Sequence, residues 1–177
     1  HTVELADTTL PHMAVQIAAP AGEALNLGRL VADGGRVDLM AAMVNQSGIV
    51  RAETLDGGGG QVVLSAAERS SVQGQIDARG EQGRGGEVQV LGREVGLLDG
   101  SSIDVSGRDG GGRIHAGGGR QGADASIRNA EALYMGPRAS LAADALERGD
   151  GGSVVLWSNR ATRAYGSLSA RGGPQGG

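Results

Sequence analysis

Hydrophobic and polar residues alternate in short stretches along the chain, and a pair of glycines precedes most of these stretches. The glycine pairs begin at positions 34, 59, 85, 111 and 151, so they are separated by 25, 26, 26 and 40 residues. Residues i and i+2 of a β-strand share one face, so alternating stretches such as residues 61–64 predict strands with one apolar side. A second such stretch follows about 14 residues later, as at 75–78. The pattern predicts at least two short strands in each unit of about 25 residues.

The apolar positions keep the same phase from unit to unit. In the first strand they are Val15, Val37, Val62, Val88, Ile114 and Val154, followed two residues later by Ile17, Leu39, Leu64, Val90, Ala116 and Leu156. In the second strand they are Leu30, Val50, Ile76, Ile103, Leu141 and Leu168, followed by Ala32, Ala52, Ala78, Val105, Ala143 and Ala170. All twenty-four are apolar, although only 39% of the chain is hydrophobic. We therefore expect equivalent positions of successive units to stack on one another.

Two further features depart from this simple repeat. A weaker third strand signal falls ten residues after the first, at Leu25, Val72, Leu98 and Ala164. The interval of 40 residues predicts an excursion near 117–137, either a loop or a short extra segment, and residues 130–134 are also compatible with a helical turn.

Short strands with one inward face and glycines at the corners predict an all-β fold, a parallel β-helix (a solenoid) of about six coils. A β-sandwich has turn signals every 8–12 residues but needs no register of 25 residues. A disordered glycine-rich linker does not keep apolar positions in phase. We expect residues 1–177 to form a single segment of this kind. The chain starts at His1 and shows no leader sequence, so we expect either a mature product or a piece of a longer protein. The glycine-rich residues 171–177 resemble an interrupted repeat, which favours the piece.

Composition excludes several classes of function. The chain has 34 glycines among 177 residues, no Cys, no Phe, one Trp and two Tyr. Without Cys, disulfides and thiolate metal sites are impossible. A net charge of −4 and few aromatic residues argue against nucleic-acid binding. No apolar run approaches the roughly 20 residues of a membrane-spanning helix.

The best candidates for chemistry are Asp77 and Asp104, which occupy the same outward position in neighbouring units. Such a pair could act as acid and base on an acidic polysaccharide, or hold Ca²⁺. The alternative is a solvated ladder in which Arg51, one unit earlier, offsets part of the charge. His115 is predicted to be an outward surface residue. Trp157 is either an exposed contact residue or packed beneath a corner loop. We expect no enzyme activity and no cofactor.

The ordered set of motifs resembles filamentous-haemagglutinin-like exoproteins of two-partner secretion. Similar runs are Asn-Leu-Gly-Arg-Leu-Val-Ala at 26–32, Asn-Gln-Ser-Gly-Ile-Val at 45–50, the triple-glycine segment at 110–122, and the segments at 149–157 and 165–173. Together they cover nearly the whole chain. The Asn-Pro-Asn motifs of that family's amino-terminal secretion domain are not visible, so we expect the chain to lie downstream of that domain or to overlap only its end.

This resemblance implies a right-handed β-helix in a large secreted protein of a Gram-negative bacterium. The partner of this protein in export would be an outer-membrane β-barrel transporter. The exported protein would be secreted or held at the cell surface. Members of the family act as adhesins, biofilm scaffolds or stalks of toxin-delivery proteins. The resemblance therefore implies a structural segment of an adhesin, whose parent protein binds a glycan or protein on a host or bacterial surface. The alternatives are a polysaccharide-active β-helix enzyme, a toxin-delivery stalk, or a segment that binds a receptor or glycan itself.

Overall fold

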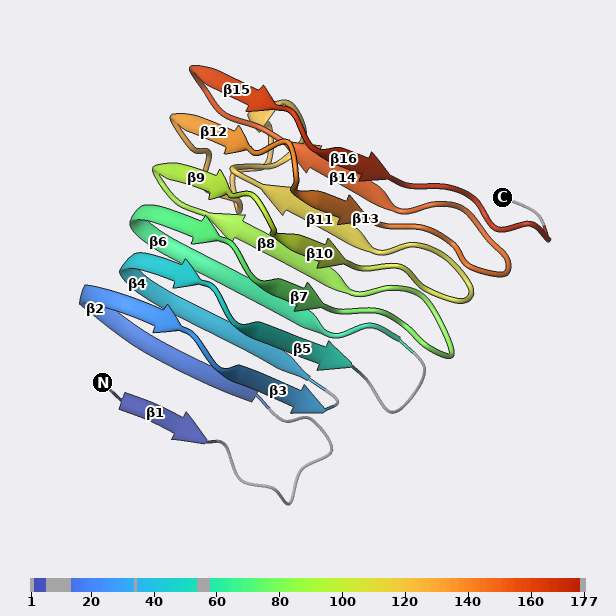
Figure 1. Cartoon of the computed structure of the whole chain (residues 1–177), viewed down its shortest axis with the longest axis horizontal. Helices are drawn as coiled ribbons and strands as arrows, with labels where there is room; N and C mark the ends of the chain where they lie inside the picture. The colour runs from blue at the N-terminus through green and yellow to red at the C-terminus, as the bar shows by residue number, and fades with distance from the viewer. Residues whose placement is uncertain (1, 6–13, 34, 54–57, 176–177) are drawn as a thin grey trace.

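The structure is a computed structural model that describes residues 2–5, 14–33, 35–53 and 58–175. These residues form sixteen β-strands and one short 3₁₀ helix, η1 (Arg120–Gly122), so the described chain is all-β with almost no helix. The strands lie in rows, and the two ends of the chain lie at opposite ends of the stack of strands (Figure 1).

Each unit contributes one strand to a first row. This row consists of the leading parts of β2 (Ala14–Asn26), β4 (Arg36–Gln46) and β6 (Gln61–Val72), followed by β8 (Glu87–Leu91), β11 (Arg113–Ala116) and β14 (Ser153–Leu156). Neighbours pair in parallel, in the order β2-β4-β6-β8-β11-β14. Val15, Val37, Val62, Val88, Ile114 and Val154 are successive register partners, as the repeat predicted.

A second, six-stranded parallel sheet forms the last row of the units. Its strands are β3 (Arg29–Asp33), β5 (Ile49–Glu53), β7 (Gln75–Asp77), β10 (Ser102–Asp104), β13 (Ser140–Ala142) and β16 (Ser167–Ser169). The predicted column from Leu30 to Leu168 is again in register through all six strands. One strand was not predicted: β1 (Thr2–Leu5) pairs antiparallel with β2 and lies outside the repeat.

The third strand signal corresponds to a complete middle row. It consists of the trailing parts of β2, β4 and β6, and then β9 (Glu94–Leu97), β12 (Ala132–Met135) and β15 (Ala161–Ala164). Its column runs Asn26, Gln46, Val72, Leu97, Met135 and Ala164. Val72 and Ala164 were therefore correct, whereas Leu25 and Leu98 were wrong by one residue. A fixed offset of ten fails because the corner between the first and middle rows varies in length, with register shifts in the earlier units.

The excursion is shorter than predicted. Residues 132–135 are strand β12, which pairs in parallel with β9 and β15, so the excursion covers only 117–131. The alternative of a helical turn at 130–134 was wrong. Leu133 and Met135 are buried and alternate with the exposed Tyr134, a period-two pattern that places these residues in the sheet.

The core consists of the inward columns, and its packing depends on having a neighbour on both sides. Ile76, Ile103 and Leu141 of the last row are at most 1% exposed, whereas Leu168, at the end of the same column, is 52% exposed. Two inward positions of the middle row are polar and buried, Asn26 and Gln46. The Asn26 side chain donates to Oε1 of Gln46 at 2.8 Å, and the Gln46 side chain donates to the Gly48 carbonyl at 2.9 Å. These bonds satisfy amides that would otherwise be costly to bury.

Glycine at the corner before the last row is required by the close approach of neighbouring units. A Cβ added to Gly74 would lie 2.0 Å from the carbonyl oxygen of Gly48, and one added to Gly48 would lie 2.0 Å from that of Gly28. Gly28 begins this column, and a Cβ there meets nothing within 4 Å.

The stacking predicts different effects for the same substitution along this column. Gly74→Ala should lower the free energy of unfolding by about 1–3 kcal/mol, because backbone must move to accept the methyl group. Gly28→Ala is the matched control and should be neutral or stabilise by about 0.4–1 kcal/mol, because it restricts the unfolded chain. Urea denaturation followed by circular dichroism measures both values. Equal effects of the two substitutions would contradict stacking at this corner.

Candidate functional site

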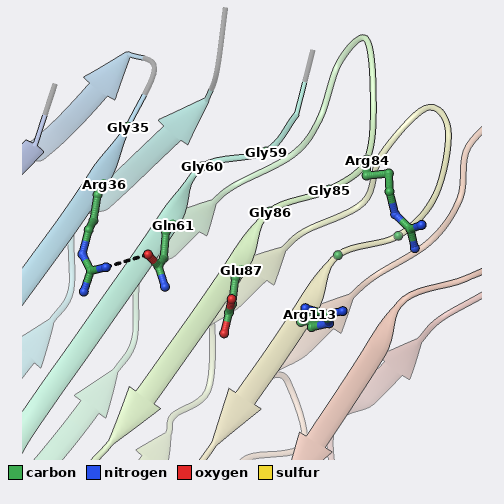
Figure 2. A pocket seen from close by; sticks show the side chains of 12 residues that line it. Gly35, Arg36, Gly59, Gly60, Gln61, Arg84, Gly85, Gly86, Glu87 and Arg113 are labelled. Carbon is green, nitrogen blue, oxygen red and sulfur yellow. Dashed lines mark hydrogen bonds between the residues drawn. The ribbon is translucent and has the colours of Figure 1, made fainter. Parts of the chain in front are cut away.

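A hollow with a volume of about 720 Å³ follows the glycine pairs at the corner before the first row. Figure 2 shows the side chains of Arg36, Gln61, Glu87, Arg113 and Arg84 around a floor of glycine backbone. The floor consists of Gly35, Gly59, Gly60, Gly85, Gly86, Gly111 and Gly112.

The floor of this groove consists of glycine because the backbones of neighbouring units lie too close together for a Cβ. A Cβ on Gly86 would lie 2.0 Å from the Gly60 carbonyl oxygen, and one on Gly112 would lie 2.0 Å from that of Gly86. The backbone N–H groups of Gly60, Gly86 and Gly112 donate to backbone carbonyls of the fold, at 3.0, 2.8 and 2.8 Å respectively. Amides that are already paired do not form an anion-binding nest. The glycines of the groove are therefore explained by the close stacking of neighbouring backbones.

The rim of the groove carries charges of both signs. Arg36 donates to Asp38 at 2.7–2.8 Å and to Oε1 of Gln61 at 2.8 Å. Glu87 lies between Gln61 and Arg113 in the strand register. Such a rim can make polar contacts, but its lining contains no hydroxyl, thiol or imidazole for nucleophilic or acid–base chemistry.

Asp77 and Asp104 are direct register partners on β7 and β10, and Arg51 precedes Asp77 on β5, as the repeat predicted. The carboxylate of Asp77 accepts two hydrogen bonds from the Arg79 guanidinium, at 2.8 and 2.9 Å, and Arg51 lies 3.9 Å away. Burial opposes ionisation of Asp77, but the bonds from Arg79 outweigh it and hold the pKa below its ordinary value. Asp104 accepts the backbone N–H of Ser106 at 2.8 Å.

Arg51, Asp77 and Asp104 thus form a ladder of charged side chains on successive strands of the last row. Among the described residues, no three or more His, Cys, Asp or Glu side chains are placed to hold a metal ion together. Within the same part of the chain, no helix is long and apolar enough to cross a membrane.

The excursion covers part of the first row, which the sequence did not reveal. His115 points outward on β11, between Gln89 and Val155 in register, yet its side chain is only 16% exposed. Arg120, Asp124 and neighbouring residues of the excursion form a cleft of about 390 Å³ with this face.

Trp157 packs against the same excursion. A Cβ on Gly118 would lie 2.9 Å from Cδ1 of the indole, and one on Gly122 would lie 2.7 Å from its Nε1. Of the two predictions for Trp157, packing beneath a loop agrees with these contacts. The glycines of the excursion leave space for the indole ring.

Asp144 is a buried carboxylate that sequence reasoning missed. It follows β13 and accepts hydrogen bonds from the Ser169 hydroxyl at 2.6 Å, the Arg171 backbone N–H at 2.7 Å and the Arg171 guanidinium at 2.9 Å. Burial works against its ionisation, but the bonds from Arg171 and Ser169 prevail and lower its pKa. Asp144 therefore ties the last unit to the one before it.

Comparison with known proteins relates the chain to two-partner secretion. Neither a protein-family model nor a curated protein sequence matches it. Among solved structures, it is similar to the crystal structure of the HMW1 secretion domain from Haemophilus influenzae, with a TM-score of 0.79 and 30% sequence identity. The match covers 85% of this chain and 40% of that one. The match supports the broader relation to two-partner secretion that the sequence resemblance indicated, but not filamentous-haemagglutinin-like proteins in particular.

The partners of Asp144 predict acid sensitivity. Because its pKa is lower in the folded state than in the unfolded chain, the stabilisation is present above about pH 4 and is lost as pH falls through the folded pKa. Asp144→Asn should therefore be less stable than the native protein at pH 7, and the difference should narrow by pH 2. Urea unfolding at several pH values measures this.

Asp150→Asn, at an exposed position in the following corner, is the matched control. It should leave the free energy of unfolding at pH 7 within about 0.5 kcal/mol of the native value. A difference between Asp144→Asn and the native protein that stays constant from pH 7 to pH 2 would contradict the role given to this carboxylate.

Proposed function

We propose that the chain is a structural segment of a protein exported by two-partner secretion, coiled as a right-handed parallel β-helix that serves as a stiff spacer in a cell-surface adhesin. The observation that carries this proposal is the register of equivalent residues through all six units, in three rows of parallel strands. Every unit is bonded to its neighbours along its length, so bending or stretching the segment would strain many backbone hydrogen bonds at once.

Export by an outer-membrane transporter is part of the proposal. Its support is the similarity to the HMW1 secretion domain, together with the motifs shared with filamentous-haemagglutinin-like exoproteins. The aligned neighbour is a secretion domain, which favours a position of this chain within or next to such a domain over one far downstream. The absence of Cys from the sequence is compatible with threading of an unfolded chain, since no disulfide can form before export.

The proposal assigns no catalytic role to the segment. A polysaccharide-cleaving site would need carboxylates free to act as acid and base beside a groove. Asp77 instead accepts hydrogen bonds from the paired guanidinium of Arg79. The groove before the first row is lined by glycine, arginine, Gln61 and one carboxylate, that of Glu87, so its lining holds no pair of carboxylates. Recognition by the whole protein then belongs to outward side chains, to the excursion, or to other parts of the protein.

Mechanical unfolding tests the spacer role. When the full chain is pulled from its two ends by atomic force microscopy, we expect stepwise unfolding, with each unit of about 25 residues releasing roughly 85 Å of contour length. Leu141→Ala should weaken the steps near the carboxyl end, because a fully buried Leu→Ala change costs about 2–5 kcal/mol.

Leu168→Ala, the same substitution at the exposed end of the same column, is the control and should change the unfolding force much less. Extension of the native chain at low force without steps would refute the stiff spacer. Transporter dependence is measured separately: with a periplasmic signal sequence attached, the chain should reach the medium of a Gram-negative host only when a two-partner transporter is co-produced.

A further inference from the structure

A second hollow lies on the outward face of the middle row and has a volume of about 440 Å³, within the usual range for small-ligand sites. Its lining comes mainly from β6, β9, β12 and β15 and includes Ser71, Gly96, Tyr134 and Arg163. These four residues are successive partners in the strand register, so they form one outward column across four units.

The hollow exists because Gly96 places no side chain in this column. On its two sides the column continues with Ser71 and Tyr134. The three atoms nearest to a Cβ added at Gly96 all belong to side chains, namely Cδ2 and Cγ of Leu98, at 3.3 and 3.9 Å, and Ser71 Oγ, at 4.0 Å. Backbone conformation does not demand glycine here either, because its φ is not in the left-handed region. Stacking therefore explains the corner glycines but not Gly96.

An aromatic ring borders this space. Tyr134 is 42% exposed, and its ring lies beside that of Tyr165, with the centroids 6.1 Å apart and the planes tilted by 57°. These are the two tyrosines of a chain that has no Phe and a single Trp. Contact with Tyr165 limits the movement of the Tyr134 ring, which leaves a fixed aromatic surface next to the empty position at Gly96.

A cation without a partner lies on the other side of Tyr134. Arg69, in the same hollow, is neutralised by Glu94 at 2.6 Å. Arg163 is exposed and, within the described part of the chain, has no ion pair or side-chain hydrogen bond. A guanidinium of this kind binds a carboxylate through two parallel hydrogen bonds.

We propose that this hollow binds an acidic sugar, with the apolar face of a pyranose ring on Tyr134 and the sugar carboxylate on Arg163. The size of the hollow, the aromatic ring and the single unpaired cation together fit a ring that carries one negative charge. The carboxylate could belong to a uronic acid within a polysaccharide or to a sialic acid at the end of a glycan. This site goes beyond the spacer role, which needs no ligand.

Isothermal titration of the full chain with three probes tests the proposal. The probes are oligogalacturonate, sialyllactose and neutral lactose. One of the acidic probes should bind and lactose should bind at least about tenfold more weakly, since a charge-assisted contact is absent. Comparison of the first two probes identifies the source of the carboxylate. No binding of either acidic probe to the folded chain, or equal binding of lactose, would overturn the proposal.

Variants then separate the site from general charge attraction. Tyr134→Ala and Arg163→Gln should each weaken binding about tenfold. Gly96→Val should abolish binding by filling the hollow, while circular dichroism and urea unfolding remain native or improve, because valine favours strands. Arg36→Gln removes the same charge on a different face and should leave binding unchanged. Loss of binding in Arg36→Gln equal to that in Arg163→Gln, or full binding by Gly96→Val, would overturn the proposal. None of these outcomes bears on the unfolding steps that test the spacer role.

Discussion

Parallel hydrogen bonding between equivalent backbone positions of successive units is the interaction on which the structure depends. It brings each paired strand residue to about one strand spacing, roughly 4.8 Å, from its register partner in the next unit. Side chains at inward positions must therefore stack on close copies of themselves, which aliphatic residues do well. Where the chain turns and backbones meet, a Cβ would collide with a carbonyl oxygen, as at Gly48, Gly74, Gly86 and Gly112.

The same constraint explains why the two ends differ from the middle. A residue in a central unit is covered on both sides, whereas one in the last unit has a neighbour on one side only, so Leu168 remains half-exposed in a column whose other members are mostly buried. At the amino-terminal end, β1 covers the leading part of β2 by antiparallel pairing. Hydrogen bonds between polar side chains join neighbouring units near the two ends. In the middle row near the amino-terminal end, the Asn26 amide donates to Gln46, which donates in turn to the Gly48 carbonyl. Asp144, with Ser169 and Arg171, ties the last unit to the one before it.

Outward positions are free of the stacking rule, so they are where functional differences can accumulate. The excursion at 117–131 lies over His115 and Trp157 without disturbing the strands on either side of it. The empty position at Gly96 lies between Ser71 and Tyr134 on an otherwise regular row. The stacked strands thus carry a few variable side chains at fixed register positions, as the proposed spacer role allows.

The sequence by itself determined the strand units, their parallel order, most of the inward positions of the first and last rows, and the pairing of Asp77 with Asp104. It could do so because a repeat with period-two alternation and fixed spacing carries its register in the order of the residues. Only the tertiary structure decided the middle row, where corners of variable length shifted the inward residue from Leu25 to Asn26 and from Leu98 to Leu97. It also decided the end of the excursion, the cover over His115, the bonds to Asp144 and the hollow at Gly96, because these contacts join residues that share no periodic relation in the chain.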